Sequence, residues 1–439
     1  MKRILFITIL ICLTLPSYNF IFAQQYCIPG RFDTTYCFSS QQITVEDNIS
    51  YGQNINWQGN PVNLDFIIAY PGTEADTLRK RPFILLIHGG GFIDGNKYQV
   101  APVMMDFAQR GYVCASINYR IGWDVTGDPF ACLGTGTSLA KAVYRAMQDS
   151  KAALRYFSAN ANKYRIDTNY FFCGGISAGA VTSLLISFAT QENMNTLYPS
   201  FINELGPLNN ASNNLTNSYK IKCVLSSSGG LNDTTFINSS NAVPTIMFQG
   251  TADLNIPYGT GNVYGCANYL RTMGSAEMMK RFKNLRKPFE LDYVPGGGHE
   301  NFYPIEYIPK KAAGFLKRYL CNDSRQVIFE NYSMISDVSL GGFNDVIPSD
   351  FTLYQNYPNP FNPSTTIKYF LPHDSRIKIN IYDTRGRKIM ELADGFQSEG
   401  FHTVNFAGAP LSSGIYFYSM ITETNGTRNI FTKKMVLVK

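Results

Sequence analysis

Strand-like and helix-like segments alternate from about residue 62 to residue 319, and this order constrains the fold more than any other feature of the chain. Apolar or alternating runs predict strands at residues 62–70, 83–88, 112–119, 170–173, 223–226, 245–248 and 291–294. Helical patterns are expected at residues 102–110, 138–160, directly after 177, 263–273 and 309–319. Such alternation predicts an α/β fold with a mostly parallel sheet and helices on both of its faces.

The last part of the chain has a different pattern. Residues 322–350 predict a polar linker, and three prolines follow within six residues, at 358, 360 and 363, where they exclude a helix. Short alternating runs then recur at 367–370, 377–382, 403–406, 415–420 and 434–438, with glycine-rich turns between them. Residues 351–439 therefore predict a small all-β sandwich. Sandwiches also serve as carbohydrate-binding or other interaction modules, so that role stays open here.

The first 23 residues predict a secretory signal peptide. A basic start at Lys2 and Arg3 precedes an apolar stretch, and Ala23 is a small residue at the expected cleavage site. No other segment is long and apolar enough to span a bilayer, so no integral membrane segment is expected after cleavage. Residues 24–321 then form the predicted α/β domain. Loss of two basic residues lowers the formal charge from +6 to +4, too mild a balance to indicate nucleic-acid binding.

Eight cysteines follow the signal peptide, and export would allow them to form disulfides. Cys27 and Cys37 flank a short loop and are the favoured pair, with Cys266–Cys321 as a second candidate. The remaining cysteines in apolar strand runs are expected to be buried thiols: Cys114, Cys173 and Cys223. The cysteine spacings do not fit a zinc site, and no metal or other cofactor is expected.

Ser177 is the candidate nucleophile. It lies in Gly-Ile-Ser-Ala-Gly at residues 175–179, directly after the strand predicted at 170–173. A sharp strand-to-helix turn of this kind exposes a serine hydroxyl at the edge of a sheet. The hydroxyl needs a base, and imidazole is the usual one. Of the four histidines, His373 and His402 lie in the tail and His88 belongs to a glycine loop, which leaves His299.

Asp253 is the candidate carboxylate that orients the imidazole. It follows the strand predicted at 245–248, and the next strand leads directly to His299. A buried carboxylate at this position would hold one tautomer of the ring and stabilise the imidazolium. Asp233, which also follows a strand-like run, is the alternative.

The strand at 83–87 ends in His-Gly-Gly-Gly-Phe at residues 88–92. Glycines allow backbone N–H groups to approach a reacting carbonyl closely. Together with the N–H of Ala178, such groups would bind the oxyanion of a tetrahedral intermediate. A phosphate-binding loop is disfavoured, because no Gly-Lys-Ser/Thr follows. Phe92 and Trp123 closely follow strand ends near this loop and are predicted to line the substrate pocket.

Residues of about 60–320 resemble the esterase/lipase branch of the α/β-hydrolase superfamily, and among its members the bacterial carboxylesterases and the feruloyl or acetyl-xylan esterases. The resemblance rests on segments 88–92, 118–120, 148–157 and 175–179, on the segment that contains Asp253, and on the order Ser177, Asp253, His299. It implies that Gly90 and Gly91 line the oxyanion hole. Ile176 departs from the pattern, since Asp, Glu or Gln often precedes the nucleophile in these enzymes.

The tail resembles the C-terminal sorting domain of type IX secretion. The matching segments are 355–363, 381–383, 411–416 and 433–437. The resemblance implies that the type IX machinery is a partner and that the protein is secreted or held at the cell surface.

The leading hypothesis is a secreted serine carboxylic-ester hydrolase that acts through an acyl-enzyme on Ser177, with a plant polysaccharide or another polymer ester as a candidate substrate. Insertions at residues 121–137 and 191–218 follow strand ends where ligands bind, so they either face the substrate, the second as a cap, or are plain surface insertions. A prolyl-oligopeptidase-type serine peptidase would use the same residue order, but no propeller-like repeats precede the domain. A non-catalytic binding module usually lacks one of the three residues, and here all three are present.

Overall fold

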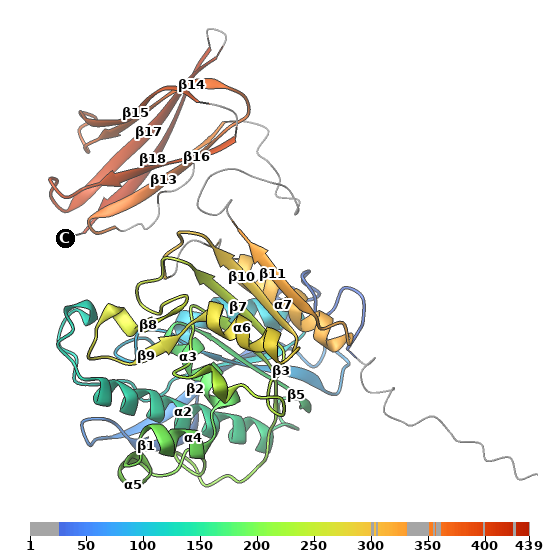
Figure 1. Cartoon of the computed structure of the whole chain (residues 1–439). Helices are drawn as coiled ribbons and strands as arrows, with labels where there is room; N and C mark the ends of the chain where they lie inside the picture. Colours follow the sequence, from blue (N-terminus) through green and yellow to red (C-terminus); the bar gives the residue numbers. More distant parts are fainter. Residues whose placement is uncertain are drawn as a thin grey trace, which may run out of the picture. The chain divides into compact units, whose positions relative to one another are not determined.

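The computed structural model describes residues 26–299, 303, 306–331, 351–353, 356, 361–397, 400–424 and 427–438. The chain divides into two compact units, Met1–Glu330 and Asn331–Lys439 (Figure 1). The predicted signal peptide and most of the predicted linker lie outside the described residues. Within the described part of the chain, no helix has the length and apolar character needed to cross a membrane.

A nine-stranded sheet forms the centre of the first unit, in the order β1-β2-β4-β3-β5-β6-β7-β10-β11. The pairs β1–β2 and β2–β4 are antiparallel, and every pair from β4 to β11 is parallel. The strands are β1 (Ile43–Ile55), β2 (Pro61–Pro71), β3 (Arg81–Ile87), β4 (Val113–Ile117), β5 (Ile166–Ile176), β6 (Ile221–Ser227), β7 (Thr245–Gly250), β10 (Phe289–Val294) and β11 (Gln326–Glu330). The mostly parallel sheet confirms the predicted fold class.

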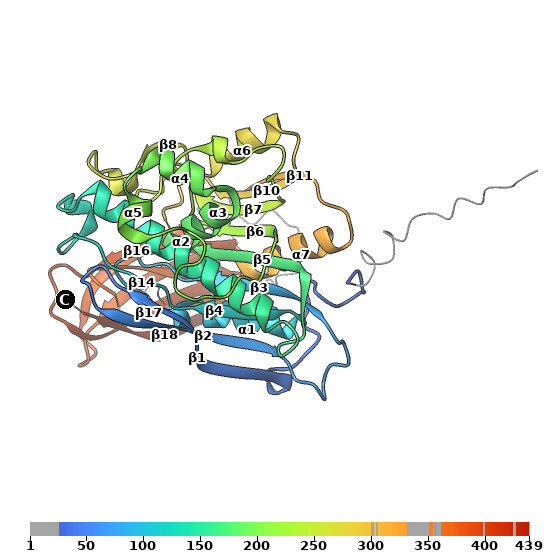
Figure 2. The same cartoon turned by 90° about the horizontal axis from the view of Figure 1, so that it is seen from below.

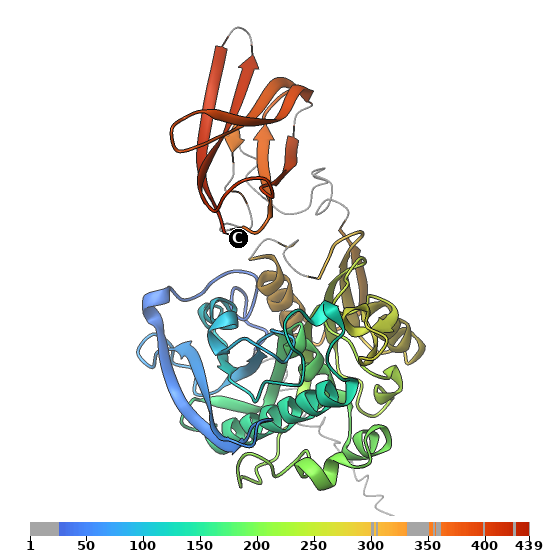
Figure 3. The same ribbon diagram turned by 90° about the vertical axis from the view of Figure 1, so that its left-hand side faces the viewer.

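Helices cover both faces of this sheet (Figures 1 and 2). One face packs on α1 (Ala101–Gln109) and α7 (Tyr307–Leu320), and the other on α2 (Gly136–Ala159), α3 (Ala178–Phe188) and α6 (Ser275–Asn284). Successive side chains of β3 alternate between the two cores, as the two-residue period of a strand requires: Leu85 packs with α2 and α3, whereas Leu86 packs with α1 and α7. Figure 3 shows α2 as a long helix running alongside the sheet.

The prediction of a helix at residues 263–273 is wrong. This segment instead forms a hairpin of β8 (Thr260–Asn262) and β9 (Arg271–Met273), with a short turn, η6 (Val263–Gly265), between the two strands. The next helix, α6, begins only at Ser275. Gly265 lies inside the predicted helix, where glycine costs stability, and it adopts a positive φ of 69° that a helix does not allow, so the chain turns there.

Both predicted disulfides are wrong. The structure pairs Cys27 with Cys321 and Cys132 with Cys266, while Cys37 is a free, exposed thiol. The first pairing follows from tertiary packing: Lys317 near the end of α7 donates to the carbonyl oxygens of Tyr26 and Arg31, which brings the first described residues of this unit beside α7. Cys114, Cys173 and Cys223 are buried free thiols, as predicted.

Two further predictions for this unit need correction. The sheet continues to β11, which pairs in parallel with β10, so residues 326–330 belong to the sheet and not to the linker. Residues 191–218 contain α4 (Gln191–Leu197) and α5 (Phe201–Leu205), and they pack on α2, where Gln148 donates to the carbonyl of Leu205. They contribute no residue to the pocket described below, so they do not cap it. Short 3₁₀ helices among the described residues, in addition to η6, are η2 (Ser40–Gln42), η3 (Lys97–Val100), η4 (Pro129–Ala131) and η5 (Thr234–Phe236).

The second unit contains a three-stranded sheet, β12-β13-β16, and a four-stranded sheet, β15-β14-β17-β18, both antiparallel. The strands are β12 (Thr352–Leu353), β13 (Ser364–Leu371), β14 (Ser375–Tyr382), β15 (Lys388–Gln397), β16 (Gly400–Ala407), β17 (Gly414–Thr424) and β18 (Thr427–Leu437). Residues of both sheets, such as Ile367 and Ile379, share one apolar core. This arrangement is the predicted all-β sandwich.

Candidate active site

Ser177 occupies the turn between β5 and α3 in a backbone conformation that residues other than glycine rarely adopt, with φ 54° and ψ −120°. Its N–H donates to the carbonyl of Ser227 at 2.8 Å, which ties the turn to the end of β6. A Cβ atom on Gly175 or Gly179 would lie 2.5 Å or 2.0 Å from the carbonyl oxygen of Ile87. The two glycines are therefore required because the turn packs directly against β3.

His299 lies beside Ser177. Its Nε2 is 2.8 Å from the Ser177 Oγ, and its Nδ1 is 2.8 Å and 2.9 Å from the two carboxylate oxygens of Asp253. The three residues follow β5, β7 and β10, which run in parallel within one sheet, so the carboxyl ends of these strands lie on the same edge. A hydroxyl, an imidazole and a carboxylate joined in this way can transfer a proton from the hydroxyl to the ring.

Asp253 is held by four donors. Its Oδ1 accepts the backbone N–H groups of Asn255 and Ile256, each at 2.9 Å, and its Oδ2 accepts the Gln249 amide at 3.1 Å. The fourth donor is the imidazole of His299. The carboxylate is fully buried, whereas the His299 side chain is 13% exposed. This carboxylate can therefore fix the ring while the other ring nitrogen contacts the Ser177 hydroxyl.

Two residues that support Asp253 and His299 were not predicted from the sequence. Gln249 is a buried polar residue near the end of β7, four positions before Asp253, and its placement in an otherwise apolar strand was the available signal. Ser228 donates its hydroxyl to the carbonyl of His299 and so fixes the loop that carries the ring. Asp233, the alternative carboxylate, instead caps η5 by accepting the N–H of Thr235, away from His299.

The glycine loop after β3 has three consecutive residues with positive φ: Gly90 at 97°, Gly91 at 59° and Phe92 at 60°. The Gly90 carbonyl accepts the N–H of Ile93 and closes the turn, and a Cβ on Gly90 would lie 2.0 Å from the carbonyl oxygen of Asp94. Only glycine fits this position, because both the torsion angle and the space exclude a side chain.

His88 stabilises this loop and takes no part in the hydroxyl–imidazole–carboxylate contacts. Burial lowers the pKa of His88 to about 4, so the ring is neutral at pH 7 and its Nδ1–H donates to the carbonyl of Gly89 at 2.8 Å. The ring stacks on Tyr119, with centroids 4.3 Å apart, and the Tyr119 hydroxyl donates to the His88 carbonyl. Next to Tyr119, Arg120 forms a buried ion pair with Asp149 of α2 at 2.8 Å.

The prediction that Trp123 lines the pocket is wrong. Trp123 instead supports the glycine loop. Its side chain is almost fully buried, and its indole N–H donates to the carbonyl of Gly91 at 3.1 Å. The ring packs edge-on against Tyr269. Phe92, the other residue predicted in the pocket, does line it.

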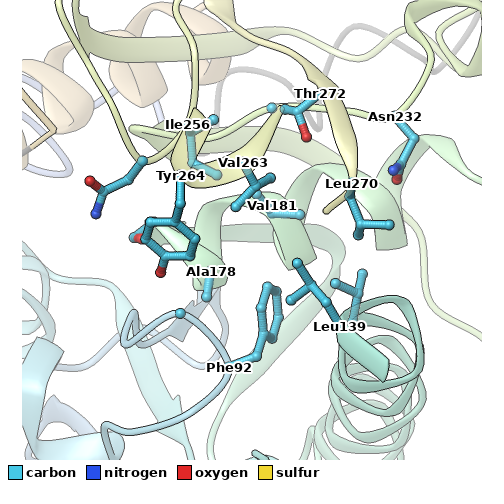
Figure 4. Close-up of a pocket in the computed structure, with 15 residues that line it drawn as sticks. Phe92, Leu139, Ala178, Val181, Asn232, Ile256, Val263, Tyr264, Leu270 and Thr272 are labelled. Carbon is cyan, nitrogen blue, oxygen red and sulfur yellow. The ribbon is translucent and has the colours of Figure 1, made fainter. Parts of the chain in front are cut away.

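The pocket next to Ser177 is largely apolar (Figure 4). Its walls come from the glycine loop, from α2 and α3, and from the β8–β9 hairpin. The lining residues are Gly91, Phe92, Leu139, Val143, Ser177, Ala178, Val181, Gly230, Asn232, Asn255, Ile256, Val263, Tyr264, Leu270 and Thr272. None of them is charged, which favours a neutral ligand. Among the described residues, no group of three or more His, Cys, Asp and Glu side chains could hold a metal ion.

Comparison with known proteins agrees with this architecture. Residues 72–235 match the family model BD-FAE, and residues 355–438 match the model of the secretion system C-terminal sorting domain. No curated protein matches the chain.

Similar solved structures include esterase 2 of Thermogutta terrifontis. Its paraoxon-phosphorylated form is 17% identical, with 65% of this chain and 95% of that chain covered and a TM-score of 0.44. Its propionate-bound form is 16% identical, with coverages of 69% and 98% and a TM-score of 0.43.

One family match falls within each of the two units. The first is an esterase-like hydrolase domain with the α/β-hydrolase fold. The second directs export to the cell surface or the medium. The chain thus joins a domain of the α/β-hydrolase esterase type to a C-terminal sorting domain of type IX secretion.

Proposed function

We propose that the protein is a secreted serine carboxylic-ester hydrolase that forms an acyl-enzyme on Ser177. The observation that carries this proposal is the continuous chain of hydrogen bonds from the Ser177 hydroxyl through His299 to the buried Asp253. The uncharged pocket supports a neutral ester as substrate. Export supports a substrate outside the cell, such as an ester group on a plant polysaccharide or another polymer.

The proposed reaction begins when the Ser177 Oγ attacks the ester carbonyl carbon and its proton moves to His299 Nε2. Asp253 accepts the Nδ1–H and stabilises the imidazolium that forms. The imidazolium then protonates the departing alcohol, and the acyl group stays on Ser177. Water, deprotonated by the same Nε2, attacks the carbonyl carbon of the acyl-enzyme. The imidazolium then returns the proton to the departing Ser177 Oγ, which releases the acid and restores the enzyme.

The oxyanion of each tetrahedral intermediate would be bound by the N–H groups of Gly90, Gly91 and Ala178. Ala178 is the first residue of α3, so its N–H points out of the helix N-terminus, where the partial positive charge favours an anion. Among the described residues, the structure gives no acceptor to the N–H groups of Gly91 and Ala178. Both residues line the pocket beside Ser177.

Ser177→Ala tests this proposal. The variant should lose hydrolysis of p-nitrophenyl butyrate and labelling by a fluorophosphonate probe, while its thermal unfolding stays close to that of the wild type. Ser187→Ala, at the other end of α3, is the matched control and should retain both activities. Labelling of the Ser177→Ala variant at the wild-type rate would contradict the assignment. A dipeptidyl p-nitroanilide in the same assay separates an esterase from a prolyl-oligopeptidase-type peptidase.

A further inference from the structure

Tyr264 reaches the candidate active site from a segment that carries none of the hydroxyl–imidazole–carboxylate residues. It lies in η6, at the tip of the β8–β9 hairpin, and has φ 55° and ψ 16°, in the left-handed region that tyrosine rarely adopts. Its N–H donates to the carbonyl of Asn255, two residues after Asp253. Non-glycine residues held in this conformation cluster at functional sites, which directs attention to what the side chain contacts.

The Tyr264 hydroxyl lies over Gly91. A Cβ atom on Gly91 would come within 2.4 Å of the tyrosine oxygen, so the oxygen occupies the space beside the Gly91 backbone that a side chain would fill. Both residues line the same pocket as Ser177. Figure 4 shows the ring of Tyr264 pointing down from the hairpin toward the glycine loop, on the same side of the pocket as Ala178.

The surrounding structure holds this ring in place. Phe130 packs edge-on against it, with ring centroids 5.0 Å apart. The Cys132–Cys266 disulfide joins the residue two positions after Tyr264 to the segment at 121–137, and the Asn268 amide donates to the carbonyls of Cys132 and Gly134. The hydroxyl is thus preorganised, which is the condition under which a donor stabilises developing charge most effectively.

We propose that the Tyr264 hydroxyl donates a hydrogen bond to the oxyanion of the tetrahedral intermediate, beside the N–H of Gly91. The proton stays on the tyrosine throughout, because the bond stabilises negative charge and no proton transfer is needed. This inference rests on the proposed ester hydrolysis. It assigns to the hairpin a direct part in the reaction, in addition to forming a pocket wall.

Tyr264→Phe tests the inference, because it removes the hydroxyl and keeps the ring that packs on Phe130. Loss of one oxyanion donor lowers kcat by about a hundredfold. We expect that loss for p-nitrophenyl butyrate, with KM changed by less than about threefold. A trifluoromethyl ketone, which forms a tetrahedral adduct with the nucleophilic serine, should lose affinity by a similar factor, whereas a merely structural role would not link the two losses.

Tyr258→Phe is the matched control, since Tyr258 precedes the same hairpin, stacks on Tyr293 and does not line the pocket. It should retain wild-type kcat. A folded Tyr264→Phe variant with kcat within threefold of the wild type would overturn the inference. Failure of the proposed function gives a different result, because the wild type itself would then be inactive or Ser177→Ala would remain active.

Discussion

Replacing Asp253 with Asn changes one atom in the proposed catalytic chain, and the structure determines which way the amide faces. The Oδ1 of Asp253 accepts the backbone N–H groups of half-buried Asn255 and buried Ile256, whereas Oδ2 accepts the Gln249 amide. The His299 ring lies within hydrogen-bond distance of both oxygens. An unsatisfied buried donor costs about 1–3 kcal/mol. Turning the amide nitrogen toward Asn255 and Ile256 would leave two donors unsatisfied, so the oxygen should keep the Oδ1 position.

The amide nitrogen then takes the Oδ2 position and donates to Nδ1 of His299. The ring must carry its proton on Nε2, which is the atom that has to accept the Ser177 proton. A catalytic triad whose imidazole is held in the Nε2–H tautomer loses about 10⁴-fold in kcat, or about 5.4 kcal/mol of transition-state stabilisation. We expect a loss of this size. The free energy of unfolding should fall by only about 1–3 kcal/mol, because both backbone hydrogen bonds remain and only the buried Gln249 amide loses its acceptor.

The assay is kcat for p-nitrophenyl butyrate, with the rate of fluorophosphonate labelling as a second readout. Asp233→Asn is the control, since Asp233 only caps η5, and it should keep full activity. A folded Asp253→Asn variant that loses less than tenfold in kcat would refute the reasoning, because His299 would then not depend on this carboxylate.

Three further results are expected. Gly179→Ala places a Cβ 2.0 Å from the Ile87 carbonyl and should lower the free energy of unfolding in urea by about 3 kcal/mol or more, whereas Gly259→Ala, with no atom within 4 Å, should have little effect. Burial lowers the pKa of His88 from 6.5 to about 4, so the unfolded chain binds a proton at this residue at a higher pH than the folded chain does. The free energy of unfolding should therefore fall by about 3 kcal/mol as the pH drops from 6.5 to 4. A His88→Asn variant whose free energy of unfolding kept the wild-type pH dependence would exclude that account. Trp123→Phe removes the indole donor to the Gly91 carbonyl and should lower kcat for p-nitrophenyl butyrate by about tenfold, since one misplaced donor group weakens oxyanion binding; a change in KM alone would argue instead for a pocket role.

The central strands were predictable because they are buried on both faces and therefore read as continuous apolar runs, as in β3. The proximity of Ser177, Asp253 and His299 could also be anticipated, since each follows a parallel strand and such strands share one carboxyl edge. Their catalytic roles remain the proposal made above.

The hairpin and the disulfides could not be predicted in the same way. The hairpin is set by contacts with residues more than a hundred positions away, such as the bond from Asn268 to Cys132. Cys27 and Cys321 are 294 residues apart, and no local pattern records that they meet. Gln249 and Ser228 reach the site by hydrogen bonds to Asp253 and His299, so their contribution can be recognised only once those side chains are placed.

The Cys27–Cys321 bridge closes almost the entire hydrolase unit into one covalent ring. Its second cysteine comes at the end of α7, so the ring can close only after nearly all of the unit has left the cytoplasm. Once it is closed, a protease that cuts a single exposed loop inside the ring opens the circle but releases no fragment. A nicked protein should therefore migrate as two pieces in a denaturing gel with reductant and as one piece without it.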